Sequence, residues 1–335
     1  MKNLYMMSFF SMMITGTLIT ISSNSWMSMW MGLEMNLLSI IPLMSNIKNK
    51  MESEAAMKYF IIQAMASTLF MLATTFMLSN NESLITNKTS LIMDLAILTK
   101  MGAAPFHFWF PEVMDGLSWM NSMIMLTWQK IAPMVIFMYT MKSMMLSTTV
   151  IISSMMISGL MGINQISMRK ILAYSSINHI GWMIGAMMTN QTLWMIYFII
   201  YSLMTVNMTM MFKLLNTSTI NQLTNSMNKT KIIKIMFSLN FLSLGGIPPF
   251  IGFYPKWITI NSMIQEKMHM LTFIMIMMTL MSLVFYMRIT FNSIIITVEE
   301  TKSKNLNNKN ITVLILSNFI VMSMLSTAPL MISFI

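Results

Sequence analysis

Four charged side chains lie inside long apolar segments of this chain or at breaks in them: Glu34, Lys100, Lys130 and Lys256. On insertion scales, one charged residue at the bilayer centre costs roughly 3 kcal/mol. Four unpaired charges would cost on the order of 12 kcal/mol, so these groups are expected to face one another, buried water or a neighbouring subunit. Ionisable groups held in this way are typical of a path that moves charge across a membrane.

Glu34 and the lysines have the chemistry that a proton relay needs. Glu34 lies about nine residues into a segment of about twenty, close to its middle. Its carboxylate is expected either to be protonated or to pair with a lysine of another helix. Burial and mutual repulsion favour the neutral amine in Lys100 and Lys130, whereas a nearby carboxylate favours the charged amine. Separating a Glu–Lys pair would therefore make the lysine pass its proton to the next site.

Structural roles for the same residues stay open. Glu34 could form an ion pair that only holds helices together. Each lysine could instead extend its charge to the membrane interface, which is easier for Lys256 than for Lys130. His179 lies in the middle of a helical segment, where its imidazole could link Lys130 to Lys256 through water or could pack as an ordinary hydrogen-bonded histidine.

Two segments of matching spacing interrupt long apolar runs. Pro105–Pro111 and Pro249–Pro255 each read Pro-Phe, three residues, an aromatic residue, Pro. Proline removes a backbone donor, and glycines beside each segment loosen the helix, which would leave carbonyls free to meet water or ions. Lys100 precedes the first break and Lys256 follows the second. Paired broken helices in the two halves of a transporter indicate an ion site at the repeat interface, although two such kinks can also match by chance.

Composition predicts an all-α, polytopic membrane protein. The chain is 56% hydrophobic and only 9% charged, with a mean hydropathy of +0.68. About 20 apolar residues span the hydrocarbon as a helix, and lipid offers no partner for irregular backbone. The stretch from Leu4 is expected to be the first span and not a cleaved signal. About eleven transmembrane helices are predicted, over residues 4–22, 25–45, 56–79, 90–111, 118–141, 148–165, 170–188, 193–215, 232–264, 269–296 and 311–335.

These helices are expected to form one antiporter-like domain, residues 1–335, in an inverted-repeat arrangement. The first half would cover about 4–188, with its helix broken at 102–105. The second half would cover about 193–335, with its helix broken at 245–249. The tail beyond about Asn292 carries no motif from which its contacts can be predicted.

The basic residues indicate the orientation. Thirteen Lys and Arg residues fall on the side of the amino terminus and only Lys88, Lys142 and Lys267 on the other. The positive-inside rule assigns the first side to the compartment of insertion, which in a mitochondrion is the matrix. The carboxyl terminus would then lie on the intermembrane-space side. The net charge of +10 thus reflects topology and contact with anionic lipids such as cardiolipin, and not nucleic-acid binding, since no compact basic domain is present.

The usual redox and metal ligands have no suitable pattern. The chain has no cysteine, and its three histidines fall on separate segments, which argues against thiolate clusters, zinc sites and paired-histidine haem. Any redox chemistry must therefore belong to partners. The 51 methionines are more than packing requires, because Leu or Ile would serve equally well. An AT-rich genome that reads AUA as Met, as animal mitochondrial genomes do, would produce this excess.

Short segments spread over nearly the whole chain also match a known family. They are Gly16–Thr20, Trp30–Asn36, Glu54–Phe60, Lys100–Trp109, Thr127–Pro133, Asn164–Gln165, Arg169–Ser176 and Leu242–Pro249. In these segments the chain resembles the antiporter-like subunits of respiratory complex I, NADH:ubiquinone oxidoreductase, and among them subunit 2 of the mitochondrial enzyme. Eleven helices suit the shortened animal form of that subunit.

The resemblance implies a proton-pumping membrane subunit of this H⁺-translocating enzyme, in the mitochondrial inner membrane. The family's proposed pathway uses a buried Glu, two central Lys residues and a Lys on the second broken helix, which match Glu34, Lys100, Lys130 and Lys256. The resemblance also implies that NADH, FMN, iron–sulfur clusters and ubiquinone belong to partner subunits and that this chain binds no cofactor. Its partners would be other membrane-arm subunits of complex I.

Our leading hypothesis makes Glu34 and Lys100 the switching pair, Lys130 the relay and Lys256 the exit-side site. A stand-alone cation/proton antiporter that binds Na⁺ or K⁺ is the alternative. Oxygen ligands would be expected for such a cation, yet Glu34 is the only central carboxylate and the lysines would repel it. A third hypothesis is a structural scaffold of a membrane complex, in which all four charged positions would tolerate neutral replacement.

Overall fold

The computed structural model describes residues 2–46, 49–79, 83–227 and 231–295, and over these ranges the chain is almost entirely α-helical. The predicted span at 311–335 lies outside the described residues. In chain order the helices are α1 (Lys2–Ser22), α2 (Trp26–Met44), α3 (Lys50–Ser79), α4 (Ser83–Met101), α5 (Trp109–Gly116), α6 (Trp119–Leu126), α7 (Trp128–Thr140), α8 (Met144–Ile163), α9 (Met168–Thr189), α10 (Gln191–Leu215), α11 (Ile220–Met227), α12 (Lys231–Gly245), α13 (Phe253–Gln265) and α14 (His269–Ile295).

Six of the described helices are long and apolar enough to cross a bilayer, judged by length and composition: those at Leu4–Ser22, Trp26–Met44, Lys50–Ser79, Met144–Ile163, Gln191–Leu215 and His269–Ser293. Their outward side chains are also apolar. On α3, for example, Met57, Ile61 and Met65 lie exposed at intervals of one helical turn. A soluble helix would place polar groups there, so this stripe fits contact with lipid.

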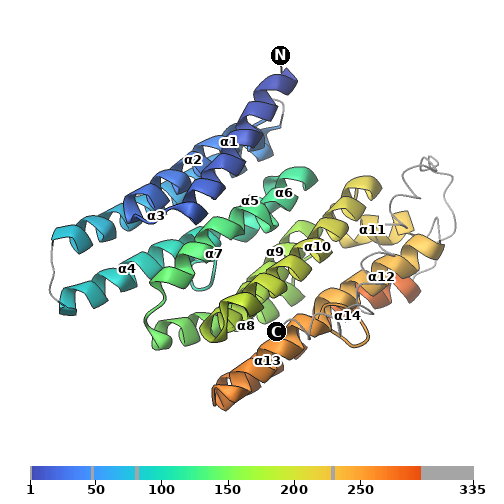
Figure 1. Ribbon diagram of the computed structural model, residues 1–335. Coiled ribbons are helices and arrows are strands. Elements are labelled where there is room, and N and C mark those ends of the chain that lie inside the picture. Colours follow the sequence, from blue (N-terminus) through green and yellow to red (C-terminus); the bar gives the residue numbers. More distant parts are fainter. Residues whose placement is uncertain (1, 47–48, 80–82, 228–230, 296–335) are drawn as a thin grey trace. The chain divides into compact units, whose positions relative to one another are not determined.

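The chain divides into two compact units, with the boundary between Val150 and Ile151, inside α8. In the first unit α1, α2 and α3 run alongside one another (Figure 1), and α4 and α7 pack together. Helix α2 begins where the sequence allows a cap: the Ser25 side chain accepts a hydrogen bond from the Ser28 amide at 3.3 Å. This packing fixes the positions of the helices that carry Glu34, Lys100 and Lys130.

In the second unit, α9 is the central helix. It packs against α10, α13 and α14, and the whole stretch Ile171–Met187 is buried, including Ser175, Asn178 and His179. A helix buried on every side is typical of the core of a large bundle or of a membrane protein. Its polar side chains must therefore find partners inside the protein.

The two helix breaks lie where the proline motifs predict them. Helix α4 ends at Met101 and α5 begins at Trp109, and α12 ends at Gly245 and α13 begins at Phe253. Each break opens with a glycine at positive φ, Gly102 at 72° and Gly246 at 78°, a conformation that glycine adopts at little cost.

Two expectations about helix boundaries, in contrast, were wrong. The predicted span Ser118–Met141 is interrupted at Thr127, between α6 and α7. The Thr127 hydroxyl donates to the Met123 carbonyl at 2.8 Å, a side-chain bond that competes with the backbone ladder and bends helices. The short helix α11 lies between the predicted spans 193–215 and 232–264, where no helix was expected. The start of α11 has the Thr-x-x-Gln pattern of a helix N-cap, in which the backbone amide of Gln222 donates to the Thr219 hydroxyl at 3.4 Å.

Candidate functional site

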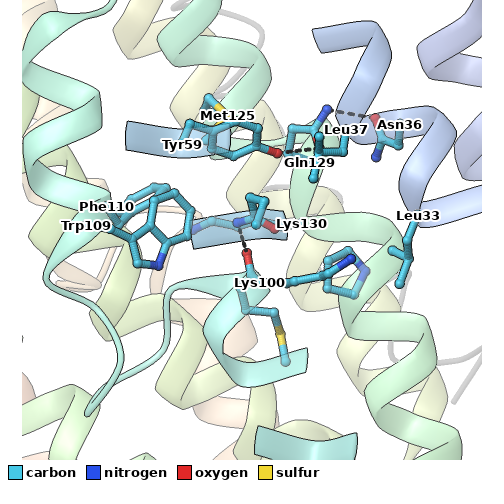
Figure 2. Close-up of a pocket in the computed structure, with 13 residues that line it drawn as sticks. Leu33, Asn36, Leu37, Tyr59, Lys100, Trp109, Phe110, Met125, Gln129 and Lys130 are labelled. Carbon is cyan, nitrogen blue, oxygen red and sulfur yellow. Dashed lines mark hydrogen bonds between the residues drawn. The ribbon is translucent and has the colours of Figure 1, made fainter. Parts of the chain in front are cut away.

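Lys100 and Lys130 line one cavity in the first unit (Figure 2). Lys100 lies in the last turn of α4 and Lys130 in the first turn of α7, and the two residues are 8% and 2% exposed. The cavity volume open to the centres of water molecules is about 20 Å³, and one water needs about 10–15 Å³. The other lining residues are Leu33, Asn36, Leu37, Tyr59, Gln63, Met101, Trp109, Phe110, Met125, Gln129 and Pro133.

The helix break beside this cavity supplies its aromatic wall. The Lys130 Nζ lies 5.3 Å from the centroid of the Phe110 ring, within the range of a cation–π interaction. The Trp109 indole donates to the Thr99 carbonyl at 3.1 Å, and the Gln63 amide donates to the Lys100 carbonyl at 3.2 Å. We expected such carbonyls to meet water or ions. Instead, side chains of the protein provide their donors.

Glu34 lies on α2 at the edge of this site. It is half-buried, and its Oε1 atom is buried with no hydrogen-bond partner among the described residues. The carboxylate is near enough to Lys100 for electrostatic attraction. Within the part of the chain that the structure describes, however, no ion pair shorter than 4.0 Å joins it to a lysine. Glu34 and Lys100 are therefore neighbours without direct contact.

Lys256 bridges the helix break of the second unit. It lies in the first turn of α13, is 6% exposed, and donates from Nζ to the Gly245 carbonyl at the end of α12, at 2.8 Å. The same Nζ lies 6.0 Å from the centroid of a ring of Trp182 on α9. The carboxyl end of a helix carries partial negative charge, so this carbonyl is a favourable partner for a buried amine.

Replacing Gly246 with Ala is expected to displace the Lys256 amine. An added Cβ would lie 2.8 Å from Nζ and 2.9 Å from Cδ of Lys256, at a φ of 78°. We expect about 1–3 kcal/mol of backbone strain, together with loss of the hydrogen bond to the Gly245 carbonyl. The measurement is the stability and proton stoichiometry of the assembled protein. If displacement of the amine causes the effect, Gly246→Ala should lower the stability clearly less in a Lys256→Met background than in the unmodified protein. An equal loss of stability in both backgrounds would contradict this explanation.

His179 belongs to a buried polar cluster in the second unit. Its Nδ1 lies 2.9 Å from the Tyr197 hydroxyl, and its ring lies 4.9 Å from that of Tyr201. Next to it, the Asn178 amide donates to the Ser282 hydroxyl at 2.9 Å. The two tyrosines were not predicted from the sequence. The available signal was their spacing of four residues on α10, which places them on one face of that helix. That His179 links Lys130 to Lys256 stays a prediction.

Comparison with known proteins defines the class of protein to which this fold and site belong. Residues 23–282 match the family model described as NADH:quinone oxidoreductase/Mrp antiporter, TM. The fold is similar to that of a chain of respiratory complex I from Thermus thermophilus, with a TM-score of 0.87 and 19% identity over 97% of this chain and 79% of that one. A chain of the Mrp complex from Dietzia sp. DQ12-45-1b gives a TM-score of 0.76 with 14% identity, over 88% and 61%. The class is that of antiporter-like membrane subunits.

Closer relatives narrow the family. The chain is 44% identical over 327 residues to NADH-ubiquinone oxidoreductase chain 2 of Anopheles gambiae, which covers 96% of both chains. The same protein of Locusta migratoria is 42% identical over 328 residues, again covering 96% of each. This chain therefore belongs to the NADH-ubiquinone oxidoreductase chain 2 family. The resemblance found in its short segments is confirmed, as is the all-helical, antiporter-like fold.

Proposed function

We infer that this chain is a core membrane subunit of respiratory complex I that translocates protons, driven by NADH oxidation and ubiquinone reduction in other subunits. The observation that carries this inference is the pair of buried amines, Lys100 and Lys130, on one cavity beside the Glu34 helix. FMN and the iron–sulfur clusters belong to partner subunits in this proposal; for the clusters, the lack of cysteine in this chain supports it. The chain contributes to the enzyme by moving protons and not electrons.

Glu34 and Lys100 act as the switching pair. An opposite charge nearby favours the charged form of a buried amine, and withdrawing that charge favours release of the proton. Glu34 is close to Lys100 but not bonded to it, so a small movement of α2 changes their attraction. The proton released from Lys100 passes to Lys130 through water in their shared cavity.

Lys256 is the exit-side site and His179 the linker toward it. We propose that the whole chain, residues 1–335, is one antiporter-like domain, with halves at about 4–188 and 193–335. Each half then contributes a broken helix with a lysine at its break, the arrangement that marks the ion site of inverted-repeat transporters. The bond from Lys256 to the end of α12 supports this role, because it ties the amine to the break.

The subunit lies in the mitochondrial inner membrane among other membrane-arm subunits of complex I. The bias of basic residues supports an amino terminus on the matrix side and a carboxyl terminus on the intermembrane-space side. The same basic residues favour contact with anionic headgroups, including cardiolipin.

Independence from metal cations tests this function against the stand-alone exchanger. Sealed vesicles that contain the assembled enzyme should build the same proton gradient per NADH in choline medium as in media with Na⁺ or K⁺, because protonated Lys100 and Lys130 on the cavity would repel a metal cation. The measurement is the change in external pH during NADH oxidation. A requirement for Na⁺ or K⁺, or cation-coupled exchange by the purified chain in liposomes, would favour the exchanger.

A further inference from the structure

A series of side-chain hydrogen bonds crosses the wall of the lysine cavity (Figure 2). The Gln129 amide donates from Nε2 to Oδ1 of Asn36 at 2.8 Å, and the Tyr59 hydroxyl donates to Oε1 of Gln129 at 3.5 Å. Asn36 and Tyr59 are buried and Gln129 is half-buried. All three residues line the same cavity as Lys100 and Lys130. They come from three different helices, α2, α3 and α7.

The short bond between Asn36 and Gln129 joins the helix of Glu34 to the helix of Lys130. Asn36 follows Glu34 by two residues on α2, and Gln129 directly precedes Lys130 on α7. Helix α7 begins only at Trp128. The Lys130 amide in this turn donates to the Thr127 carbonyl at 3.3 Å, and the Gln129 side chain adds a contact that ties the turn to α2.

These two amides are suited to positioning and not to proton transfer. Neither side chain titrates, so the pair cannot exchange a net proton with the lysines. Together they fix a distance, because an amide–amide bond in a buried site is costly to leave unmade. A displacement of α2 by a fraction of an ångström would therefore pull directly on the turn that carries Lys130.

We propose that Asn36 and Gln129 are positioning residues that transmit movement of the Glu34 helix to the Lys130 amine. The inference rests on the proposed proton relay and adds to it a mechanical link between its first and second steps. Leu has the same branched shape as Asn and is slightly shorter than Gln, and at either position it removes the bond. In the assembled enzyme, Asn36→Leu and Gln129→Leu should each lower proton-coupled turnover about tenfold and shift its pH profile.

A reciprocal exchange tests whether the contact itself matters. The double variant Asn36→Gln, Gln129→Asn keeps both amides and the total length of the bridge, whereas each single change makes the bridge too long or too short. We expect the double variant to recover most of the assembly and of the protons translocated per NADH that either single change loses. The proposal would be overturned if the double variant assembles and translocates protons no better than its two single variants. This holds even if the single variants fail to assemble, because the double variant should then restore assembly.

Asn121 provides a matched control. The side-chain amide of Asn121 on α6 likewise bonds to α2, where it donates to the Leu43 carbonyl at 3.1 Å. Unlike Asn36 and Gln129, Asn121 does not line the cavity. Asn121→Leu should leave the pH profile unchanged. The same shift in this control would overturn the proposal, because general packing of α2 would then explain the effect.

The proposed function can fail separately from this inference. If Lys130→Ala retains the full number of protons per NADH, the relay itself is wrong and the inference falls with it. If Lys130→Ala loses protons while Asn36→Leu and Gln129→Leu behave as the unmodified enzyme, the relay stands and the positioning role is overturned.

Discussion

Replacement of Lys100 with Ala is expected to separate electron transfer from proton translocation. The amine is buried, lines the cavity shared with Lys130 and lies near Glu34. A positioned proton-transfer group contributes about 10²–10⁴-fold to its step. We therefore expect proton transfer through this chain to slow at least about 100-fold, while NADH oxidation continues. The measurement is the number of protons translocated per NADH in sealed vesicles.

Lys88 on the same helix is the control for this experiment. Its side chain is exposed, so Lys88→Ala should leave the proton stoichiometry unchanged. Native electrophoresis shows whether each variant assembles to the same extent. Full stoichiometry in an assembled Lys100→Ala enzyme would remove this lysine from the path. Equal tolerance at Glu34, Lys130 and Lys256 would favour the structural scaffold instead.

Replacement of Gly252 with Ala is expected to prevent assembly of the second unit. Gly252 lies between α12 and α13 with φ at −65°, which any residue adopts, so backbone conformation is not the obstacle. The obstacle is space: an added Cβ would overlap the backbone carbonyl oxygen of Ser243 on α12. A rotamer change cannot relieve an overlap with backbone, and the two helices would have to move apart. We expect a loss of about 3 kcal/mol or more.

The measurement is the amount and thermal stability of assembled enzyme, and Gly245 is the matched control. A Cβ at Gly245 would meet Tyr286 Cδ2 at 3.5 Å and Leu283 Cγ at 3.9 Å, which are ordinary contacts. Gly245→Ala should therefore assemble normally. If the Gly252→Ala variant assembles as well as this control, the close approach of Gly252 to α12 is not required for the fold.

Much of the architecture could be predicted because the bilayer leaves few choices. Apolar runs of spanning length must be helices, since lipid provides no partner for unpaired backbone groups. The breaks before Trp109 and Phe253 could be placed because Pro and Gly act on the backbone locally. The lysines could also be singled out from the sequence. The free-energy cost of a charge in an apolar segment depends mainly on the surrounding medium, and the hydropathy of the segment already indicates that medium.

The interruption at Thr127 could not be predicted in this way. Threonine occurs within many continuous helices, and its side-chain bond to Met123 bends the chain here only in combination with the surrounding packing. The donors to the carbonyls of Thr99 and Lys100 were missed as well. They come from Trp109 and Gln63, and which side chain reaches a free carbonyl depends on how the helices pack.

The sequence by itself determined that this chain is a helical membrane protein, where two of its helices break, and which lysines lie in apolar surroundings. Only the tertiary structure decided that Lys100 and Lys130 share a cavity, that Lys256 is bonded to the end of α12, and that Asn36 meets Gln129. The physical reason is the range of the interactions. Hydropathy, proline and glycine act over one helix or one turn, whereas a contact between side chains 93 residues apart exists only once the helices have packed.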